Sequence, residues 1–333
     1  MAERLGHQRP PAPAPAREGP VELDTDAILR LLYGNNMSDY TRTEAHGTLN
    51  GQPIADISAV RTLLGTLDRQ LSPSPASVRF RRPDLRMACV AGLTLALDQA
   101  DASVSQPILT ASAWEPHLTS VFRSYVRPGQ HVVDVGANVG YFTVLAGTLV
   151  GPSGRVTAIE PNSENCRLIL ISLDANGLTN VDLIPVALDR RRGWSHFSTH
   201  VGSNGGLRPN AIDGIIDDAG QIVPVFPLDD LVDQPVHFLK IDVEGAEYRA
   251  LIGAQRIIDR DRPIVSSEFS VEMIERVSGV PAADYLDFFT SRRYRINIID
   301  RADGSLRSCE SGAALLENWP DRLHLEDLLF LPE

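Results

Sequence analysis

Residues 131–142 read His-Val-Val-Asp-Val-Gly-Ala-Asn-Val-Gly-Tyr-Phe. In this stretch an apolar run that contains Asp134 is followed at once by Gly136 and Gly140, and apolar residues then recur at helical spacing as far as Val150. The pattern predicts a buried strand, a tight glycine turn and the start of a helix. Glycine at these two positions lets the backbone turn sharply and lets a ligand approach without a Cβ in the way.

The spacing of this turn indicates the kind of ligand that it binds. A loop that binds the pyrophosphate of a dinucleotide would read G-x-G-x-x-G and would place the phosphates on the helix N-terminus. Here the spacing is G-x-N-x-G, and Asp134 ends the strand just before the turn. A carboxylate there would repel a diphosphate and attract a cationic amino-acid head group. S-adenosylmethionine (SAM) fits, because it carries an ammonium, a sulfonium and a ribose but no phosphate.

A second acid ends the next predicted strand. Residues 155–160 read R-V-T-A-I-E, and Pro161 and Asn162 follow. An acid at the end of the second strand is where a nucleoside ribose is held through its hydroxyl groups. A lone glycine turn is also compatible with a plain strand–helix connection, but two acids that end two successive strands favour a cofactor site.

Composition and charge narrow the classes of partner. The chain has 333 residues, of which 43% are hydrophobic and 22% charged, as in ordinary soluble globular proteins. The net charge is −12 and no basic stripe is present, so nucleic acid is not expected as a partner. No apolar run is long enough to span a bilayer and no signal segment is evident, so we expect no membrane association and a cytoplasmic location.

The three cysteines also bear on the compartment. Cys89, Cys166 and Cys309 are scattered and form no C-x-x-C pair. Neither a disulfide framework nor a zinc site is therefore indicated. We expect reduced, mostly buried thiols.

The chain divides into three predicted regions. Residues 1–20 form a Pro- and Ala-rich leader that we expect to be disordered, and residues 21–109 form a small N-terminal extension. Within this extension we expect helices at 24–33 and 57–71, and short strands or a hairpin in 77–108. Residues 110–333 form the main domain.

In the main domain, strands and helices alternate, which predicts an α/β fold with a doubly wound, mostly parallel sheet. The predicted strands are 131–137, 155–160, 181–188, 236–243 and 263–269, followed by 294–300 and 323–331 as an antiparallel pair that closes the edge. An insertion at about 190–230 interrupts the alternation and is expected to form a hairpin and loop at the carboxyl side of the sheet.

Ligands of open α/β sheets bind outside the carboxyl ends of the strands. Four predicted strands end there in an acid, namely Asp134, Glu160, Asp242 and Glu268. Asp242 lies inside an apolar strand, where an unpaired carboxylate is expensive to bury, so we assign it a function. Oxygen ligands from Asp242 and Glu268 make Mg²⁺ a minor alternative as a cofactor. We expect Glu244 and Glu247 only to open the following helix.

Three blocks of sequence together resemble the FkbM family of SAM-dependent methyltransferases, within the class I Rossmann-like methyltransferase fold. They are F-L-K-I-D-V-E-G-A-E at 238–247, D-V-G-A-N-V-G-Y-F-T at 134–143 and A-I-E-P-N at 158–162. The resemblance covers roughly residues 110–300, and the L-D-D-L at 228–231 is also similar. It implies a seven-stranded sheet with helices on both faces. It also implies methyl transfer from SAM, usually to a hydroxyl of a saccharide or secondary metabolite.

The resemblance also implies roles for individual residues. The methionine end of SAM would be held by Asp134, Gly136, Asn138 and Gly140, with Tyr141 beside them. Glu160 would take the ribose hydroxyls, while Pro161, Asn162, Ala187 and Leu188 would flank the ribose and adenine. Asp242 would face the reacting centre. Asn138 replaces the middle glycine of the common methyltransferase loop and narrows the space beside the cofactor.

An alcohol that attacks the methyl group must lose its proton, and a base in reach typically contributes about 10²–10⁴ in rate. Asp242 is the first candidate for this base and His200, in the insertion, is the second. Lys240 either pairs with a nearby acid or orients the substrate. His196 and His237 are expected to be structural.

Several alternatives stay open at this stage. The same fold could methylate a nitrogen, and a catalytically inactive binding module is a further reading. An NAD-dependent oxidoreductase is a different class, against which the loop spacing and Asp134 both count. The expected acceptor is a small molecule or a saccharide, and a homo-oligomer is compatible with the sequence.

Overall fold

The structure is a computed structural model of the chain. It describes residues 48–49, 52–53, 84–201, 204–208 and 220–333. The chain divides into two compact units, residues 1–79 and 80–333. In the first unit the described residues form a short antiparallel pair, β1 (Thr48–Leu49) and β2 (Gln52–Pro53). The predicted leader and the helices predicted at 24–33 and 57–71 lie outside the described residues.

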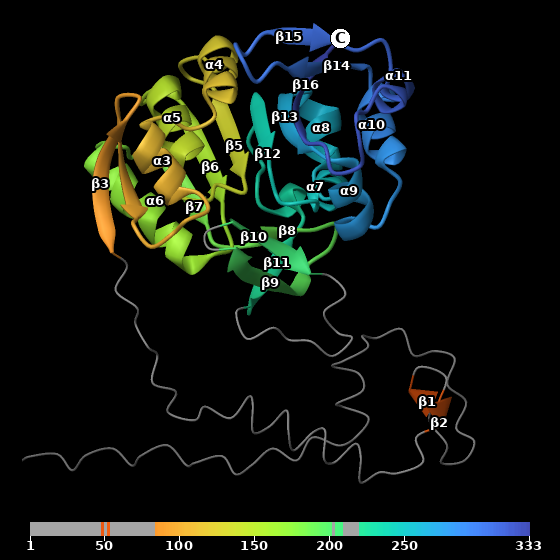
Figure 1. Cartoon of the computed structure of the whole chain (residues 1–333), viewed down its shortest axis with the longest axis horizontal. Coiled ribbons are helices and arrows are strands. Elements are labelled where there is room, and N and C mark those ends of the chain that lie inside the picture. Colours follow the sequence, from red (N-terminus) through yellow and green to blue (C-terminus); the bar gives the residue numbers. More distant parts are fainter. Residues whose placement is uncertain (1–47, 50–51, 54–83, 202–203, 209–219) are drawn as a thin grey trace, which may run out of the picture. The chain divides into compact units, whose positions relative to one another are not determined.

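The second unit is built on one large mixed sheet (Figure 1). In spatial order its eight strands are β15 (Leu306–Ser308), β14 (Tyr294–Ile299), β16 (Glu326–Pro332), β13 (Ile264–Phe269), β12 (Phe238–Ile241), β5 (His131–Val135), β6 (Arg155–Ile159) and β7 (Val181–Ile184). The five strands from β13 to β7 are parallel to their neighbours, whereas β16 is antiparallel to both β13 and β14. The predicted mostly parallel sheet is confirmed.

Three details of the sheet differ from the prediction. It has eight strands instead of seven, because the short β15 pairs with the edge of β14. The last two predicted strands do pair antiparallel, but β16 inserts between β13 and β14, so the pair does not itself close the edge. The strand predicted at 181–188 breaks into β7 and β8 (Ala187–Leu188) at Pro185, which has no N–H to donate to a ladder.

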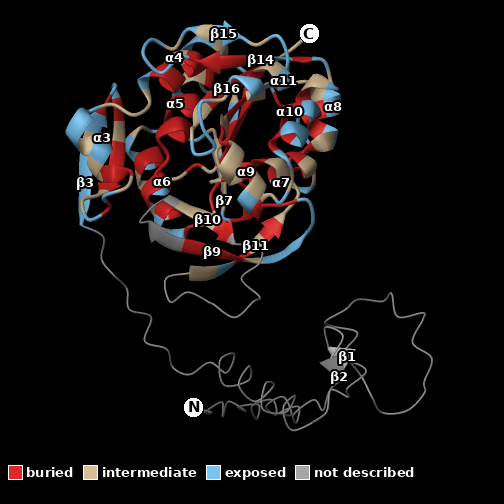
Figure 2. Ribbon diagram, turned by 45° about the vertical axis from the view of Figure 1, so that its right-hand side comes forward, coloured by how far each residue is buried: buried red, intermediate tan, exposed pale blue. Residues whose placement is uncertain are grey.

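Helices cover both faces of the sheet because alternate strand residues point to opposite faces. Val132 packs into a core with α3 (Ser105–Ala111), α4 (Pro116–Tyr125), α5 (Tyr141–Val150) and α6 (Ser163–Ala175). Val133 packs into the other core, with α7 (Glu247–Ile252), α8 (Gln255–Asp261), α9 (Val271–Val277), α10 (Ala282–Thr290) and α11 (Gly312–Glu317). Figure 2 shows the strands buried between these two layers. The doubly wound arrangement is therefore confirmed.

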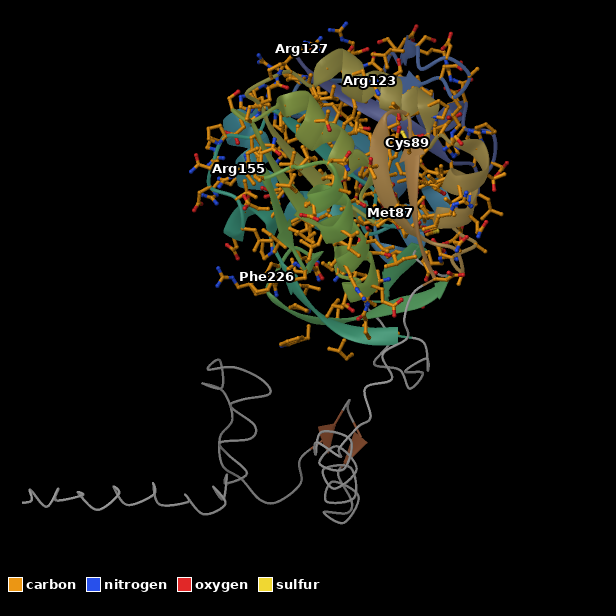
Figure 3. All side chains as sticks on the ribbon, turned by 90° about the vertical axis from the view of Figure 1, so that its left-hand side faces the viewer. Met87, Cys89, Arg123, Arg127, Arg155 and Phe226 are labelled. Atoms are coloured by element: carbon orange, nitrogen blue, oxygen red, sulfur yellow. The ribbon has the colours of Figure 1, made fainter. Side chains whose placement is uncertain are left out.

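The hairpin expected within 77–108 is present as β3 (Leu85–Val90) and β4 (Leu93–Asp98), although the end of that segment is helix α3. It packs on α6, so the compact unit begins at residue 80 and not at the predicted boundary of 110. Met87 and Cys89 lie exposed on β3 (Figure 3). The expectation of mostly buried thiols is thus wrong for Cys89, while Cys166 is buried and Cys309 half-buried, and all three are free.

The insertion folds into a second, smaller sheet at the carboxyl side of the main one (Figure 1). Its strand order is β10 (Asn204–Arg208), β9 (Gly193–Val201), β11 (Gly220–Phe226) and β8. The predicted hairpin is β9–β10, and β11 joins it to β8. Phe226 lies at the end of β11 (Figure 3). The short 3₁₀ turn η2 (Leu228–Asp230) then leads back to β12.

The L-D-D-L motif at 228–231 has a structural role. Both carboxylate oxygens of Asp229 accept backbone N–H groups at the start of α8, from Arg256 at 2.9 Å and Ile257 at 3.0 Å. Asp229 therefore caps this helix. Among the helices that the structure describes, none is long and apolar enough to cross a membrane.

We predict that Asn176→Ala weakens the attachment of the hairpin. The Asn176 side chain accepts a hydrogen bond from the Thr94 N–H at 3.0 Å and donates one to the Thr94 carbonyl at 2.6 Å. Removing both bonds should lower the free energy of unfolding by about 1–3 kcal/mol, measured by urea denaturation. Asp174→Ala, an exposed position near the end of the same helix, is the control and should change it by less than about 0.5 kcal/mol. Equal losses in both variants would contradict this account.

Candidate active site

A buried lysine lies at the centre of the main sheet. Lys240 on β12 stands opposite Asp134 on β5 and is only 3% exposed. Its Nζ lies 3.0 Å from Oδ2 of Asp242 and 3.9 Å from Oδ1 of Asp134, and 5.4 Å from the centroid of the Phe142 ring. Of the two roles considered for Lys240, the structure therefore supports pairing with acids.

The charges in this group depend on one another. Burial by itself lowers the pKa of Lys240, but the carboxylates of Asp242, Asp134 and Glu115 raise it above its ordinary value. Burial raises the pKa of Asp134, while Lys240 and a hydrogen bond that Thr143 donates at 2.6 Å act in the opposite direction. Removing the lysine would leave buried carboxylates without a countercharge, which is strongly destabilising.

The glycine turn has left-handed backbone at three positions. Gly136, Asn138 and Gly140 have φ values of 76°, 52° and 90°. Glycine adopts this conformation freely, and asparagine tolerates it better than most residues, which explains why Asn138 can replace a glycine here.

The clearance that the two glycines provide is used by the protein itself. A Cβ on Gly136 would overlap the carbonyl oxygen of Asp242, and a Cβ on Gly140 would lie 2.8 Å from Ile169 on α6. The expected open approach for a ligand is therefore not what these glycines supply. They let the backbone that follows β12 and helix α6 pack closely against the turn.

Glu160 joins the two strand ends. Its Oε2 accepts the backbone N–H of Asn138 at 2.7 Å, and its Oε1 accepts that of Asn162 at 2.8 Å and a longer bond from the Asn165 side chain at 3.4 Å. Burial raises the pKa of Glu160 to about 7 although these hydrogen bonds lower it. The carboxylate thus holds the glycine turn against the loop after β6.

A cleft of about 540 Å³, open to solvent, lies at these strand ends. Its wall consists of Val135, Gly136, Asn138, Ile159, Glu160, Pro161, Val186, Ala187, Leu188, Phe197, Gly205, Leu207, Asp242, Val243 and Glu244. The charged members are Glu160, Asp242 and Glu244. Within the part of the chain that the structure describes, no Lys, Arg or His lines this cleft.

The structure brings most of the predicted site residues to this cleft. Those that line it are Gly136, Asn138, Glu160, Pro161, Ala187, Leu188 and Asp242. Those that do not are Asp134, Gly140, Tyr141, Asn162 and Lys240. His200 lies in β9, and its side chain is outside the described part of the structure.

The residues below the cleft have structural partners. Asp134 is fully buried, so it does not present its carboxylate to the cleft as we expected. The hydroxyl of Tyr141 lies 3.0 Å from that of Thr119, and the Asn162 side chain caps α6 by accepting the Glu164 N–H at 3.0 Å. These residues shape the site without lining it.

Two groups of cleft or near-cleft residues were missed from the sequence. Phe197, Gly205 and Leu207 come from the inserted sheet, whose folding back over the cleft has no local signal. Glu115 adds an acid beside Asp242, and Asp327 stands opposite Glu268 across β16 and β13. They come from segments far from any motif in the sequence.

Two acids beside Asp242, Glu115 and Glu268, favour their protonated forms. Burial, followed by the charge of Asp242, raises the pKa of Glu115 to about 8 and that of Glu268 well above its ordinary value. Asp327 instead binds His117 at 2.8 Å and Arg301 at 3.4 Å. Across the described residues, no group of three or more His, Cys, Asp or Glu side chains is arranged to hold a metal ion.

The loop after β12 is fixed from below by Glu247. Its Oε1 accepts the backbone N–H groups of Val243 at 3.0 Å and Gly245 at 3.1 Å. Glu244 does not open a helix as we expected: it has a left-handed φ of 57° and lines the cleft, and α7 begins at Glu247. The loop that carries Asp242 and Glu244 is therefore held in one conformation.

The chain matches one family model and is similar to curated methyltransferases. The family model of the methyltransferase FkbM domain matches residues 134–296. Protein-L-isoaspartate O-methyltransferase 1 of Arabidopsis thaliana is 27% identical over 143 residues, which cover 38% of this chain and 61% of that protein. Protein-L-isoaspartate O-methyltransferase of Triticum aestivum is 37% identical over 60 residues, or 18% and 24% of the two chains.

Among solved structures, methyltransferase FkbM from Methylobacillus flagellatus KT is similar with a TM-score of 0.39 and 18% identity. The match covers 64% of this chain and 50% of that one. The chain thus spans less than two thirds of the length of each of these three proteins.

We predict that Glu247 makes folding stability depend on pH. Burial raises the pKa of Glu247 from 4.5 to about 7, so the folded state keeps a proton that the unfolded state releases. Its contribution is therefore fully present below about pH 4.5 and is lost as the pH rises through 7. Glu247→Gln keeps the carbonyl that accepts both N–H groups and removes the titration.

Between pH 5 and 8 the unfolding free energy of the wild type should fall relative to that of Glu247→Gln, by at most roughly 3 kcal/mol. Urea denaturation at four pH values measures this difference. Glu164→Gln, an exposed position in α6, is the control and should follow the wild type. Parallel curves for the wild type and Glu247→Gln would contradict the prediction.

Proposed function

Since residues 134–296 belong to the methyltransferase FkbM domain family, we propose that this protein is a SAM-dependent methyltransferase whose acceptor is a hydroxyl group of a saccharide or another small hydroxylated metabolite. The observation that carries the proposal is the charge of the cleft. Every charged side chain in its described wall is a carboxylate, and these carboxylates stand at the carboxyl ends of β6 and β12.

The cleft fits SAM better than a dinucleotide. Carboxylates attract the ammonium and sulfonium groups of SAM, whereas they repel the diphosphate of NAD. A carboxylate has about four acceptor positions, and three N–H contacts to Glu160 leave one for a ribose hydroxyl. The apolar side chains of Ile159, Val186 and Leu188 provide a surface for the adenine ring.

When bound, SAM supplies an electrophilic methyl carbon on its sulfonium. Asp242 lines the cleft with its side chain 31% exposed, and its Oδ2 is held by Lys240. In the described part of the chain nothing hydrogen-bonds to its Oδ1, which can therefore accept the proton of an acceptor hydroxyl. Lys240 acts as a positioning residue that fixes this carboxylate at the strand end.

The surroundings of Asp242 support a neutral, hydroxyl-bearing acceptor. The carboxylates of Asp242 and Glu244 in the cleft wall would oppose the approach of an anionic acceptor such as nucleic acid. Glu115 and Glu268, beside Asp242, instead favour their protonated forms. Protonated carboxyl groups also donate hydrogen bonds, which suits a polyhydroxylated molecule. Both curated relatives described above are named as O-methyltransferases, which supports oxygen as the atom that receives the methyl group.

The first test concerns the donor. Isothermal titration calorimetry should show that the protein binds SAM and S-adenosylhomocysteine and does not bind NAD. Glu160→Gln should weaken binding of S-adenosylhomocysteine at least about tenfold, because the ribose loses a charged acceptor. Glu164→Gln, an exposed position four residues later in the first turn of α6, should bind like the wild type. Binding of NAD in preference to SAM would overturn the proposal.

The second test concerns the base. Asp242→Asn keeps an oxygen that can accept a hydrogen bond from Lys240, but it cannot take a proton. With methyl-labelled SAM and a panel of saccharides and metabolites, turnover should fall about 10²–10⁴-fold. Donor affinity should stay nearly unchanged. Unchanged turnover would remove Asp242 as the base, and label found on nitrogen in the product would replace the hydroxyl acceptor by an amine or amide.

A further inference from the structure

The inserted sheet forms one wall of the cleft. Three of its residues, Phe197, Gly205 and Leu207, line the cavity together with Ala187 and Leu188, the two residues of β8. Because β8 leaves the main sheet and pairs with β11, the chain passes directly from the strand ends of the main sheet into this wall. The insertion therefore belongs to the same cavity as Glu160.

The inner face of this wall is apolar and has its own small core. Phe197, Leu207, Val223 and Val225 pack with Ala187, Ala246 and Val277, separately from the two large cores of the main sheet. The outer face of the same strand differs: Trp194 is 73% exposed. The alternation along β9 thus directs Phe197 toward the cleft and Trp194 away from it.

The Phe197 ring is held in place by the backbone of the neighbouring strand. Phe197 is 5% exposed and stands opposite Leu207 in the β9–β10 pair. The register shifts between Asn204 and Gly206, and a Cβ on Gly205 would overlap the ring. Glycine inside a strand often marks a close approach of this kind. Gly205 therefore allows the ring to lie where it meets the cavity.

The same hairpin reaches the loop that carries the acids. A Cβ on Gly206 would lie 3.2 Å from the Cβ of Glu244. The apolar wall accordingly runs from Leu188 to the edge of the Asp242–Glu244 loop. Glu160 lies on another part of the cleft wall, formed by the loop after β6.

We propose that Phe197 is a binding residue for the methyl donor and that the inserted hairpin supplies the wall on which the purine base of the donor stacks. The inference rests on the proposed function, because it takes SAM as the ligand of the cleft. The only aromatic ring that the described wall offers to a flat base is Phe197. The insertion is then part of the cofactor site.

The experiment compares three variants by titration calorimetry with S-adenosylhomocysteine and with adenosine as probes. Phe197→Ala should weaken the binding of both roughly ten- to one-hundredfold, because both carry the base. Gly205→Ala should weaken both as well, since it displaces the ring. Trp194→Ala, on the outer face of the same strand, should bind both probes like the wild type.

A variant that unfolds would give no binding for a trivial reason, so melting temperatures are measured without ligand. Phe197→Leu keeps the apolar volume and serves where Phe197→Ala is unstable. It should still bind less tightly than the wild type, because the flat ring is lost. A wild-type protein that binds neither SAM nor S-adenosylhomocysteine would overturn the proposed function itself. If the wild type binds S-adenosylhomocysteine and folded Phe197 variants bind it equally well, this inference alone is overturned. It is also overturned if the Phe197 variants change only the KM of the acceptor.

Discussion

The charge of Lys240 is the constraint on which the centre of this domain depends. A single ammonium group lies buried between two parallel strands, and it is stable there only because carboxylates surround it. Asp134 is locked from the other side by Thr143, whereas Asp242 stands where the strand ends and is partly exposed. One lysine thus links an acid that belongs to the core with an acid that belongs to the cleft. The position of Asp242 is set by electrostatics inside the sheet as well as by the loop that follows it.

Close packing at the strand ends also fixes the position of the backbone around Asp242. Gly136 lies against the carbonyl of Asp242, and the N–H of Asp242 donates to the carbonyl of Val135 at 3.1 Å. Glu160 ties the glycine turn to the loop after β6, and Glu247 ties down the loop after β12. These two buried carboxylates replace most of their hydration with backbone N–H groups. Burial outweighs these hydrogen bonds and raises the pKa of both groups, so keeping them charged in the site costs stability.

Local patterns in the sequence were sufficient for much of this fold. The strand–turn–helix at 131–150, the alternation of strands and helices and the acids at the strand ends all follow from periodicity and turn residues, which are short-range properties. The position of β16 between β13 and β14 does not, because spatial order depends on which edges the chain pairs after it leaves the sheet. Asp134 illustrates the limit within the site. The sequence predicts that its carboxylate binds the ligand, but strand alternation turns the side chain toward α5. Its burial there is explained by Lys240, which stands opposite it on β12. Phe197 and Glu115 reach the site through tertiary contacts that no motif announces.

The acidic wall of the cleft matches the change in charge that methyl transfer brings about. Under the proposed function the donor enters with a positive sulfonium, and the product that remains is a neutral thioether. Glu160, Asp242 and Glu244 therefore attract the donor more strongly than the demethylated product, whereas an apolar wall such as Phe197 and Leu207 treats the two alike. The charged part and the apolar part of the cleft therefore contribute to donor binding in two different ways. The apolar wall contributes affinity that both forms share, and the carboxylates contribute the difference between them. Only the difference in affinity between donor and demethylated product favours the replacement of product by fresh donor. The acids at the strand ends therefore affect turnover even where they transfer no proton.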